Sequence, residues 1–242
     1  MSFLADVLHS SRRDLEVYTE RLCACLSDLS FESDVKRIYI VKSRIKSYDS
    51  IRSKLLQYHR DLRLHNDPSL TMSRLMTYVE DVVGIRVLCL FPDDVNSIAN
   101  RLYFERGPTR TIRVIRDKDN KAKLYRYYLF KPLMQINMDD ESWRTASRKD
   151  TGYSSVHAIA HFSDNSRMHD LFGDWRAEIQ IRTVLEEAWG ETSHYLSYKK
   201  ATTDRTVNDL RLAAVSINEL NARLQSISND ALAYQAANDF RF

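Results

Sequence analysis

Side chains between residues 42 and 54 have the types and the spacing to bind a triphosphate. Lys42, Arg44 and Lys46 stand at alternate positions, so in an extended segment their charges lie on one face. Ser50 and Lys54 follow four residues apart in a stretch of helical pattern, which places them on one side of a helix. This fork of donors predicts phosphate binding. An exposed basic edge strand explains the same pattern equally well.

Two acidic residues stand beside apolar strands, where they suit metal binding. Asp81 immediately precedes the apolar run 82–90, and a carboxylate at the mouth of a buried strand suits a hard cation such as Mg²⁺. Glu178 alternates with apolar residues, so it shares one strand face with Gln180 and Arg182. This second carboxylate either completes the metal site or takes a proton from an attacking hydroxyl. A strand-leading cap and an ordinary amphipathic strand are the plainer alternatives.

An aromatic residue follows a glycine just before residue 157, as at sites where a ring stacks on a base. Gly152 frees the backbone ahead of Tyr153, whose ring can stack on a nucleobase. His157 and His161 have the spacing of helical metal ligands. On a strand, however, they lie roughly 13 Å apart at about 3.3 Å per residue. We therefore exclude a zinc site shared by these two histidines.

Two further metal motifs are also rejected. Cys23 and Cys25 stand alone on a segment of helical pattern, without further ligands nearby in the sequence. His169 and Asp170 form an isolated His-Asp dipeptide, which lacks the spaced partners of a metal-dependent phosphohydrolase. The pair is predicted to lie in a surface loop or at the start of a helix.

Composition narrows the way in which this chain can hold phosphate. Its 242 residues include only 5 Gly, whereas average usage is about 7%. Such scarcity excludes a sandwich or propeller of tight turns, and the sequence contains neither a P-loop nor a G-x-G-x-x-G motif. Helices and long side chains must therefore hold any phosphate.

Three cysteines and the hydropathy pattern point to a cytoplasmic protein. The odd cysteine count, with two of them one residue apart, favours a reducing compartment. The longest apolar run, near residues 82–91, is far shorter than a membrane span and is broken by Gly84 and Arg86. No contact with a membrane is therefore expected.

The remaining pattern predicts an α/β (α+β) fold, a mixed β-sheet flanked by helices. Helical spacing is seen in 2–29, in 47–64, from Pro92 to about residue 105, and from Val184 to the end. Strand patterns occupy 34–46, 79–91, two parts of 108–137 around a charged turn, 156–162 and 176–182. Residues 138–152 are polar and irregular.

The C-terminal segment has a seam of its own. Apolar residues recur there at spacings of three and four: Leu210, Ala213, Ile217, Leu220, Leu224, Ile227, Ala231 and Tyr234. This pattern is typical of a helix that packs lengthwise on another helix. The N-terminal helix is the first candidate partner, and a second copy of the chain, in a homo-oligomer, is the other.

Positive charge is concentrated in two segments of a chain whose net charge is only +3. Residues 35–63 hold nine Lys and Arg against two Asp, and residues 101–131 hold ten against three acids. A single charge run is usually a solvated face. Two runs in a nearly neutral chain instead favour a polyanionic partner, either a nucleoside triphosphate or a nucleic acid backbone.

Four blocks of this sequence, in order, resemble the synthetase domain of RelA/SpoT homologues. They are Arg44-x-Lys46 with Ser50 and Lys54, Glu80-Asp81-x-x-Gly84-x-Arg86, Gly152-Tyr153-x-x-x-His157, and Glu178-Ile-Gln-Ile-Arg-Thr183 with Ala188-Trp189, His194 and Tyr198-Lys199. The blocks run from about residue 40 to 199. The last block is the most specific of the four.

This resemblance implies a nucleotidyltransferase-like sheet and a pyrophosphokinase that forms (p)ppGpp and AMP from ATP and GDP or GTP. ATP is then held by Arg44 at the adenine and by Lys46, Ser50 and Lys54 at the phosphates. Asp81 and Glu178 would hold Mg²⁺, with Glu178 also near the 3′-hydroxyl. The acceptor would lie on Tyr153, surrounded by Lys149, His157 and Gln180.

The segment 139–149 departs from the family pattern beside the acceptor site, so the acceptor base is the least fixed part of this expectation. Some compact relatives are toxins that make an adenine alarmone or pyrophosphorylate the 3′ end of tRNA, and the basic run 101–131 leaves tRNA open. A toxin of this kind would have an antitoxin or immunity protein as its partner. A nucleotide- or RNA-binding module of the same fold is the alternative that is not an enzyme.

We expect three parts along the chain. Residues 1–33 form an N-terminal helix, 34–200 the synthetase domain and 201–242 a C-terminal helical extension. No hydrolase domain is expected before the synthetase domain and no long regulatory region after it. The sequence thus predicts a small member of the family with a single activity.

Overall fold

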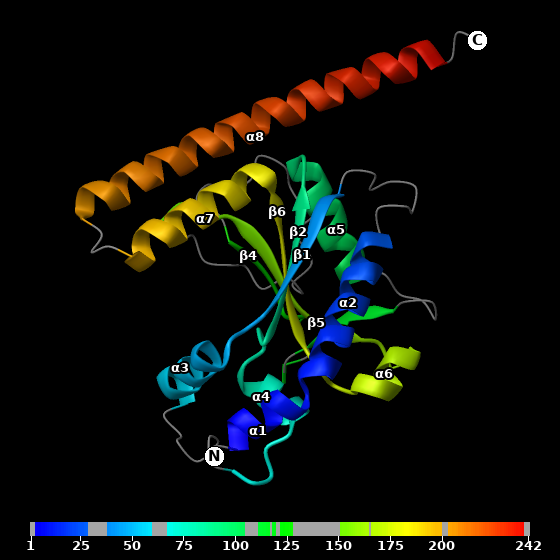
Figure 1. Ribbon diagram of the computed structural model, residues 1–242. Helices are drawn as coiled ribbons and strands as arrows, with labels where there is room; N and C mark the ends of the chain where they lie inside the picture. The colour runs from blue at the N-terminus through cyan, green and yellow to red at the C-terminus, as the bar shows by residue number, and fades with distance from the viewer. Residues whose placement is uncertain are drawn as a thin grey trace.

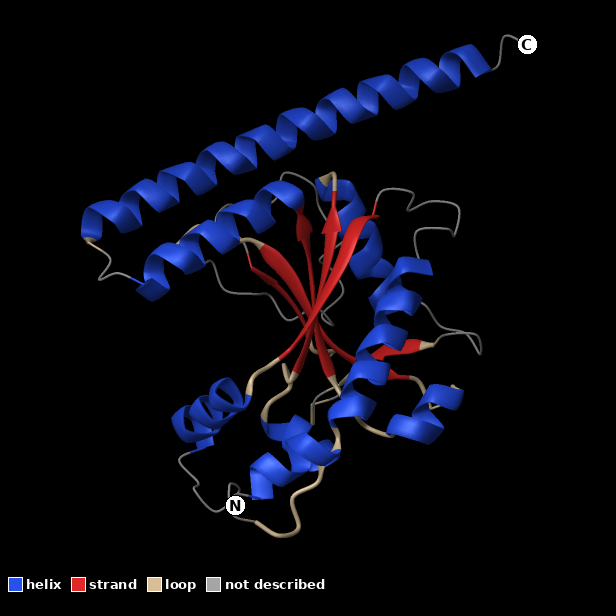
Figure 2. Cartoon of the chain, viewed as in Figure 1, coloured by secondary structure: helices blue, strands red, loops and turns tan. Residues whose placement is uncertain are grey.

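A six-stranded mixed sheet forms the middle of the molecule, with helices on both of its faces (Figures 1 and 2). The computed structural model describes residues 3–28, 38–59, 67–104, 111–116, 118–119, 122–127, 151–164, 166–199 and 203–239. The strands are β1 (Ile38–Ile45), β2 (Val83–Cys89), β3 (Ile112–Val114), β4 (Leu124–Tyr127), β5 (Ser155–Phe162) and β6 (Ala177–Thr183). Their order is β1-β2-β6-β5-β3, with β4 also paired to β5.

The sheet combines both strand directions, as the sequence predicted. Strands β2 and β6 are parallel, whereas the β1–β2, β5–β6, β3–β5 and β4–β5 pairs are antiparallel. The central strands β2, β5 and β6 are mostly buried. Buried on both faces, β2 therefore shows an apolar run rather than an alternating pattern.

Eight helices lie in the described part of the chain. They are α1 (Phe3–Ser10), α2 (Arg12–Asp28), α3 (Tyr48–His59), α4 (Met72–Tyr78), α5 (Pro92–Phe104), α6 (Arg167–Phe172), α7 (Val184–Lys199) and α8 (Asp204–Asp239). Helix α2 packs on β1 and β2 (Figure 1). Its Tyr18 is fully buried, meets Phe162 edge to face at 5.4 Å and donates a hydrogen bond of 2.7 Å to the carbonyl of Trp175. This face of the sheet is the core of the molecule.

The helix α4 was not predicted, and the strand expected over 79–91 is shorter in the structure, because residues 79–82 form the C-cap of α4 and a turn. Thr71 caps its first turn by accepting a hydrogen bond from the amide of Arg74. Val79 ends the helix, with its N–H bonded to the carbonyl of Leu75. Because this apolar stretch is buried as a short helix followed by a turn, periodicity alone could not separate it from the strand that begins at Val83.

A capping box fixes the start of α7 directly at the end of β6. The amide of Thr183 donates to Glu186 at 2.7 Å, and the amide of Glu186 donates to the Thr183 hydroxyl at 3.2 Å. Asn221 of α8 donates to the same hydroxyl at 3.1 Å. The strand that carries Glu178 is thus held at its carboxyl end by α7 and α8 together.

Helix α8 packs on α7 and α5. The prediction that it packs on the N-terminal helix is therefore wrong. Its buried residues are Ala214, Asn221 and Gln225, a stripe one position away from much of the predicted seam. Two of these three are polar, which is why an apolar pattern missed them. Gln225 accepts a hydrogen bond of 3.0 Å from the amide of Asp93 at the start of α5. The later seam residues Ile227 and Tyr234 are 63% and 76% exposed, and a homo-oligomer stays a prediction.

Cys23, Cys25 and Cys89 are all free thiols. Among the described residues, no helix has the length and apolar character that crossing a bilayer requires.

Candidate active site

The sheet register sets polar side chains in two rows on the face opposite α2. In the first row Arg44 pairs with Gly84, and Gly84 pairs with Glu178. In the second row, Lys42, Arg86, Gln180 and His157 are consecutive partners on β1, β2, β6 and β5. Cations of β1 and the carboxylate of β6 therefore lie two strands apart on one face, which the sequence predicted from alternation within each strand.

A hollow of about 130 Å³ opens on this face. It is lined by Lys42, Ser43, Arg44, Gly84, Ile85, Arg86, Glu178 and Gln180. Gly84 forms part of its floor, where an added Cβ would lie 3.4 Å from Nε of Arg44. Sites for whole ligands usually reach roughly 300–1,000 Å³, so this hollow suits one part of a nucleotide.

Asp81 is bound by two lysines at the mouth of β2. Nζ of Lys46 lies 2.5 Å from Oδ2, and Nζ of Lys54 lies 2.8 Å from Oδ1. Burial raises the pKa of Asp81, but the hydrogen bonds and charges of both lysines outweigh it and leave the pKa below its usual value. Lys46 and Lys54 thus converge on one carboxylate, as expected of residues that share one site. The neighbouring Glu80 bonds instead to Lys123 and Arg176, away from Asp81.

Glu178 accepts two hydrogen bonds from the acceptor residues that the sequence predicted. Nδ1 of His157 lies 2.9 Å from Oε1, and Nε2 of Gln180 lies 2.8 Å from Oε2. Burial raises the pKa of Glu178, but His157 and Gln180 lower it by more than burial raises it, so the pKa lies below its usual value. The negative charge of Asp81 acts in the opposite direction, which shows that the two carboxylates influence each other. Glu178 is therefore ionised at neutral pH.

A relay of hydrogen bonds connects Glu178 to Tyr153 through His157. The Tyr153 hydroxyl lies 2.8 Å from Nε2 of His157. Burial raises the pKa of Tyr153, so its hydroxyl keeps its proton at neutral pH. Because the ionised Glu178 can only accept, Nδ1 of His157 carries the hydrogen of their bond. This arrangement fixes the orientation of both side chains.

The Tyr153 ring stands among other rings and a cation. Tyr127 meets it edge to face at 5.9 Å, and the guanidinium carbon of Arg182 lies 5.6 Å from its centroid. Tyr153 also packs against the cluster of Trp189 and Ala214, which links it to α7 and α8. The ring is therefore held at the edge of the polar face, where the sequence predicted an aromatic platform.

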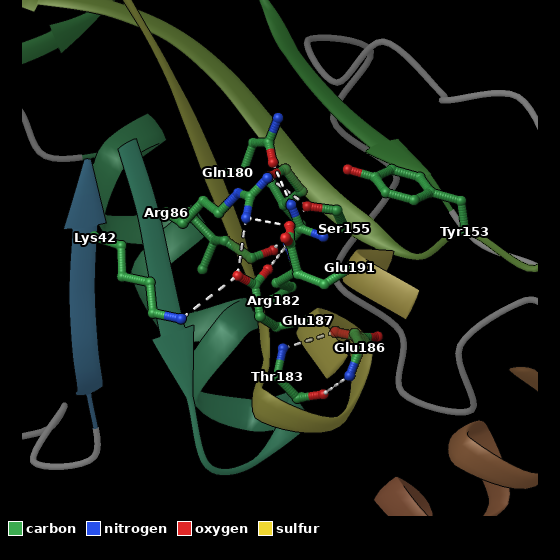
Figure 3. A network of polar contacts seen from close by, with 12 residues as sticks. Lys42, Arg86, Tyr153, Ser155, Gln180, Arg182, Thr183, Glu186, Glu187 and Glu191 are labelled. Atoms are coloured by element: carbon green, nitrogen blue, oxygen red, sulfur yellow. Dashed lines mark hydrogen bonds and ion pairs between the residues drawn. The ribbon is translucent and has the colours of Figure 1, made fainter. Parts of the chain in front are cut away.

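A network of ion pairs covers the polar face under α7 (Figure 3). Arg86 bonds to Glu187 at 3.0 Å and also to Glu191. Glu187 in addition lies 3.3 Å from Arg182 and 3.8 Å from Lys42. The side chains of Arg182 and Glu187 are only 3% and 7% exposed. The Arg182–Glu187 contact is an ion pair without hydrogen-bond geometry.

This network continues into the site, because Arg182 also donates to Gln180, which holds Glu178. Sequence reasoning missed Glu187 and Tyr127. Glu187 stands in an acidic first turn of a helix, where a solvated role is usual, and no local signal separates it from Glu186. Tyr127 belongs to a four-residue strand whose pairing with β5 alone brings it to His157.

The structure brings together most of the residues that the sequence singled out. Asp81, Lys46 and Lys54 form one group, and Glu178, His157, Gln180 and Tyr153 form the other. Arg44 lies between them over Gly84. Ser50 lies in the first turn of α3, where its hydroxyl accepts a hydrogen bond of 2.9 Å from the Ser47 hydroxyl. Lys149 lies outside the described residues.

The two carboxylates fit a magnesium ion in chemistry and in environment. Both are part-buried, both have pKa values below normal, and the charge of Asp81 acts on the pKa of Glu178. Carboxylate oxygens combined with substrate phosphates are the usual ligands of Mg²⁺. In this structure the oxygens of Asp81 are neutralised by Lys46 and Lys54. The two lysine amines therefore supply, beside the Asp81 oxygens, the positive charge that a metal ion would bring.

The ion pairs of Asp81 predict a specific dependence of stability on pH. Since its folded pKa lies below the usual value of 3.8, the pairs stabilise the protein above about pH 4 and are lost as pH falls further. Asp81→Asn should lower the free energy of unfolding at pH 7 by about 1–3 kcal/mol. This gap should narrow below pH 4 in urea titrations. Asp230→Asn on exposed α8 is the control, and a gap that stays constant with pH would contradict the role of the ion pairs.

Comparison with known proteins was made against families, sequences and solved structures. The family model described as a region found in RelA / SpoT proteins matches residues 43–203. The chain is 24% identical over 193 residues to GTP pyrophosphokinase YwaC of Bacillus subtilis (strain 168). This matched region covers 78% of this chain and 73% of the relative. It is also 24% identical over 212 residues to GTP pyrophosphokinase YjbM of the same strain, covering 86% and 80%.

Solved structures show the same fold. The small alarmone synthetase 1 from Bacillus subtilis bound to its product pppGpp superposes with a TM-score of 0.60 at 19% identity, over 93% of this chain and 96% of that one. This similarity confirms the predicted nucleotidyltransferase-like sheet. Because the family model spans four blocks of motifs that also meet in space, the resemblance is confirmed, and the chain belongs to the RelA/SpoT family.

Proposed function

We propose that this chain transfers the pyrophosphate group of ATP to the 3′-hydroxyl of GDP or GTP, giving (p)ppGpp and AMP. One observation carries the proposal. Lys46 and Lys54 converge on Asp81, and the charge of Asp81 reaches Glu178, so two amines and two carboxylates lie close together. The relatives YwaC and YjbM are named GTP pyrophosphokinases, and a protein of the same fold has been solved with pppGpp as its product.

ATP would lie along β1 and the start of α3. Arg44, over Gly84, contacts the adenine, while Lys46, Ser50 and Lys54 take the phosphates. A triphosphate carries more negative charge than one carboxylate, so it draws both amines away from Asp81. Asp81 is then available, with Glu178, to hold Mg²⁺. The ion pairs in this structure therefore keep the lysines in place before ATP arrives.

Magnesium, when bound, neutralises negative charge on the phosphates. The acceptor would stack on Tyr153, with His157, Gln180 and Lys149 around it. Its 3′-oxygen forms a bond to the β-phosphorus, the bond from this phosphorus to the α-phosphate oxygen breaks, and AMP leaves. Glu178 takes the proton of the 3′-hydroxyl. Its lowered pKa makes it a weak base, which suffices because phosphoryl-type transfer depends mainly on positioning and charge.

Two observations bear on the alternative acceptors. Within the described parts of the basic run 101–131, Lys123 bonds to Glu80 and Arg113 to Asp164, so these charges are already paired. This pairing weakens the argument for tRNA. The retained carboxylates likewise weaken the argument for a module that only binds nucleotides. Neither alternative gains support from a residue of the site.

An acceptor panel tests the proposal directly. The protein is incubated with Mg²⁺, ATP labelled in its terminal phosphate and, in turn, GDP, GTP, ADP, ATP or deacylated tRNA. We expect label to pass to GDP and GTP, with AMP formed in equal amount, and to stop when EDTA removes Mg²⁺. Label only on adenine nucleotides or on tRNA would refute the guanine acceptor. Label on none of them would refute the enzyme.

A further inference from the structure

Three side chains away from the polar face of the sheet converge at the far end of β5. They are His161 on β5, His169 on α6 and Asp174 in the turn between α6 and β6, and one ligand atom from each lies within 4.8 Å of the others. Figure 1 shows α6 beside β5, on the other side of the molecule from α3. Both histidines are half-buried, and Asp174 is exposed.

His161 has a ring nitrogen without a hydrogen bond. Its Nδ1 is buried and has no partner among the described residues. A buried polar atom without a partner destabilises the fold unless it binds something, so this nitrogen is available to a ligand. Burial lowers the pKa of His161, with the carboxylates of Asp164 and Asp174 acting in the opposite direction.

The surrounding charges favour a divalent cation. Asp164 lies 3.6 Å from Nε2 of His169, so a second carboxylate stands beside the three ligands. Arg113, which pairs with His161 across β3 and β5, lies near the group and is neutralised by Asp164 at 3.0 Å. Asp174 and Asp164 thus place two carboxylates beside the two imidazoles.

We propose that His161, His169 and Asp174 bind one zinc ion at a site separate from the nucleotide face. Two imidazoles and a carboxylate are common zinc ligands, and the fourth position is left for water or for Asp164. Tetrahedral bonds of about 2.0–2.1 Å place ligand atoms roughly 3.3 Å apart. The exposed Asp174 side chain and the surface helix α6 close the remaining distance by small movements.

The proposed zinc ion has a structural consequence for the active site. It joins the end of β5 to the segment that leads into β6, and Asp174 stands four residues before Glu178. Sequence reasoning tested His161 only against His157 and considered His169 only together with Asp170. That pairing was correctly excluded, but the fold supplies a different histidine that no spacing rule could indicate.

Zinc binding by the full chain, first stripped with EDTA, tests this proposal. Calorimetry with ZnCl₂ in excess Mg²⁺ should show one tight site per chain, and zinc should raise the melting temperature. His169→Gln and Asp174→Asn, both on accessible residues, should each weaken zinc affinity at least tenfold. His9→Gln and Asp170→Asn are the matched controls on exposed helix positions and should bind as the wild type does.

Cobalt identifies the ligands independently of affinity. Co²⁺ in a four-coordinate nitrogen and oxygen site gives strong visible bands, and these should vanish in Asp174→Asn. A near-ultraviolet charge-transfer band would instead show thiolate ligands and overturn the site. Equal zinc affinity in all variants, or no zinc binding by the wild type, would overturn it as well. Activity in the acceptor panel is a separate readout, so the failure of one proposal does not imply that of the other.

Discussion

Replacing Glu178 with Gln should reduce pyrophosphate transfer by roughly 10³-fold and leave ATP binding nearly unchanged. The variant keeps the size of the side chain and an oxygen for the hydrogen bond from Nδ1 of His157. It loses the charge that the site maintains, since His157 and Gln180 hold the pKa of Glu178 below normal. We expect kcat to fall and the KM for ATP to stay within a few fold, the signature of a group that acts in the transition state.

Two measurements accompany this substitution. The amide nitrogen of the new Gln would face Nε2 of Gln180, so one hydrogen bond is lost, at a cost of about 1 kcal/mol in unfolding free energy. A urea titration confirms that the variant is folded. Glu219→Gln, on the exposed side of α8, is the control for any general effect of removing an acid. Turnover by Glu178→Gln equal to that of the control would refute the assigned role.

Alternation within strands was enough to predict half of this site. Glu178 and Gln180 share a face because side chains on a strand alternate, and the same rule placed Lys42 with Arg44. The rule says nothing about which strands are neighbours. That Arg44, Gly84 and Glu178 form one row depends on the parallel pairing of β2 with β6, two strands about ninety residues apart in the sequence. Long-range pairing therefore had to come from the structure.

Polar residues buried by ion pairs were the hardest to predict. Glu187 is a charged residue in the first turn of a helix, a position where acids are usually solvated and favoured by the helix dipole. Only the approach of β2 and β6 brings Arg86 and Arg182 to it. The same limit explains α8, where Asn221 and Gln225 face inward because they cap Thr183 and the start of α5. Patterns of apolar residues cannot show such contacts.

Gly152→Ala should destabilise the protein by about 2–5 kcal/mol, the largest effect that we expect for a single methyl group. Gly152 has a φ of +93°, which costs a residue with a side chain about 1–2 kcal/mol. Its added Cβ would lie 2.4 Å from Cβ of Ala214 and 3.3 Å from Cζ2 of Trp189. Overpacking of this kind adds about 1–3 kcal/mol. Gly173→Ala is a matched control, because Gly173 has a φ of +56° with nothing within 4 Å of the added Cβ.

A double substitution separates the two causes. In Gly152→Ala/Ala214→Gly the contact with α8 is removed, so the packing part of the loss should be recovered while the backbone part remains. The single Ala214→Gly variant measures the cost of a glycine inside a helix, about 1 kcal/mol. If Gly152→Ala is no less stable than Gly173→Ala, then α8 does not press on this loop in solution. Tyr153 follows Gly152 directly and packs on Ala214 and Trp189. Recovery in the double variant would therefore show that the C-terminal helix sets the position of the predicted acceptor platform and is part of the site.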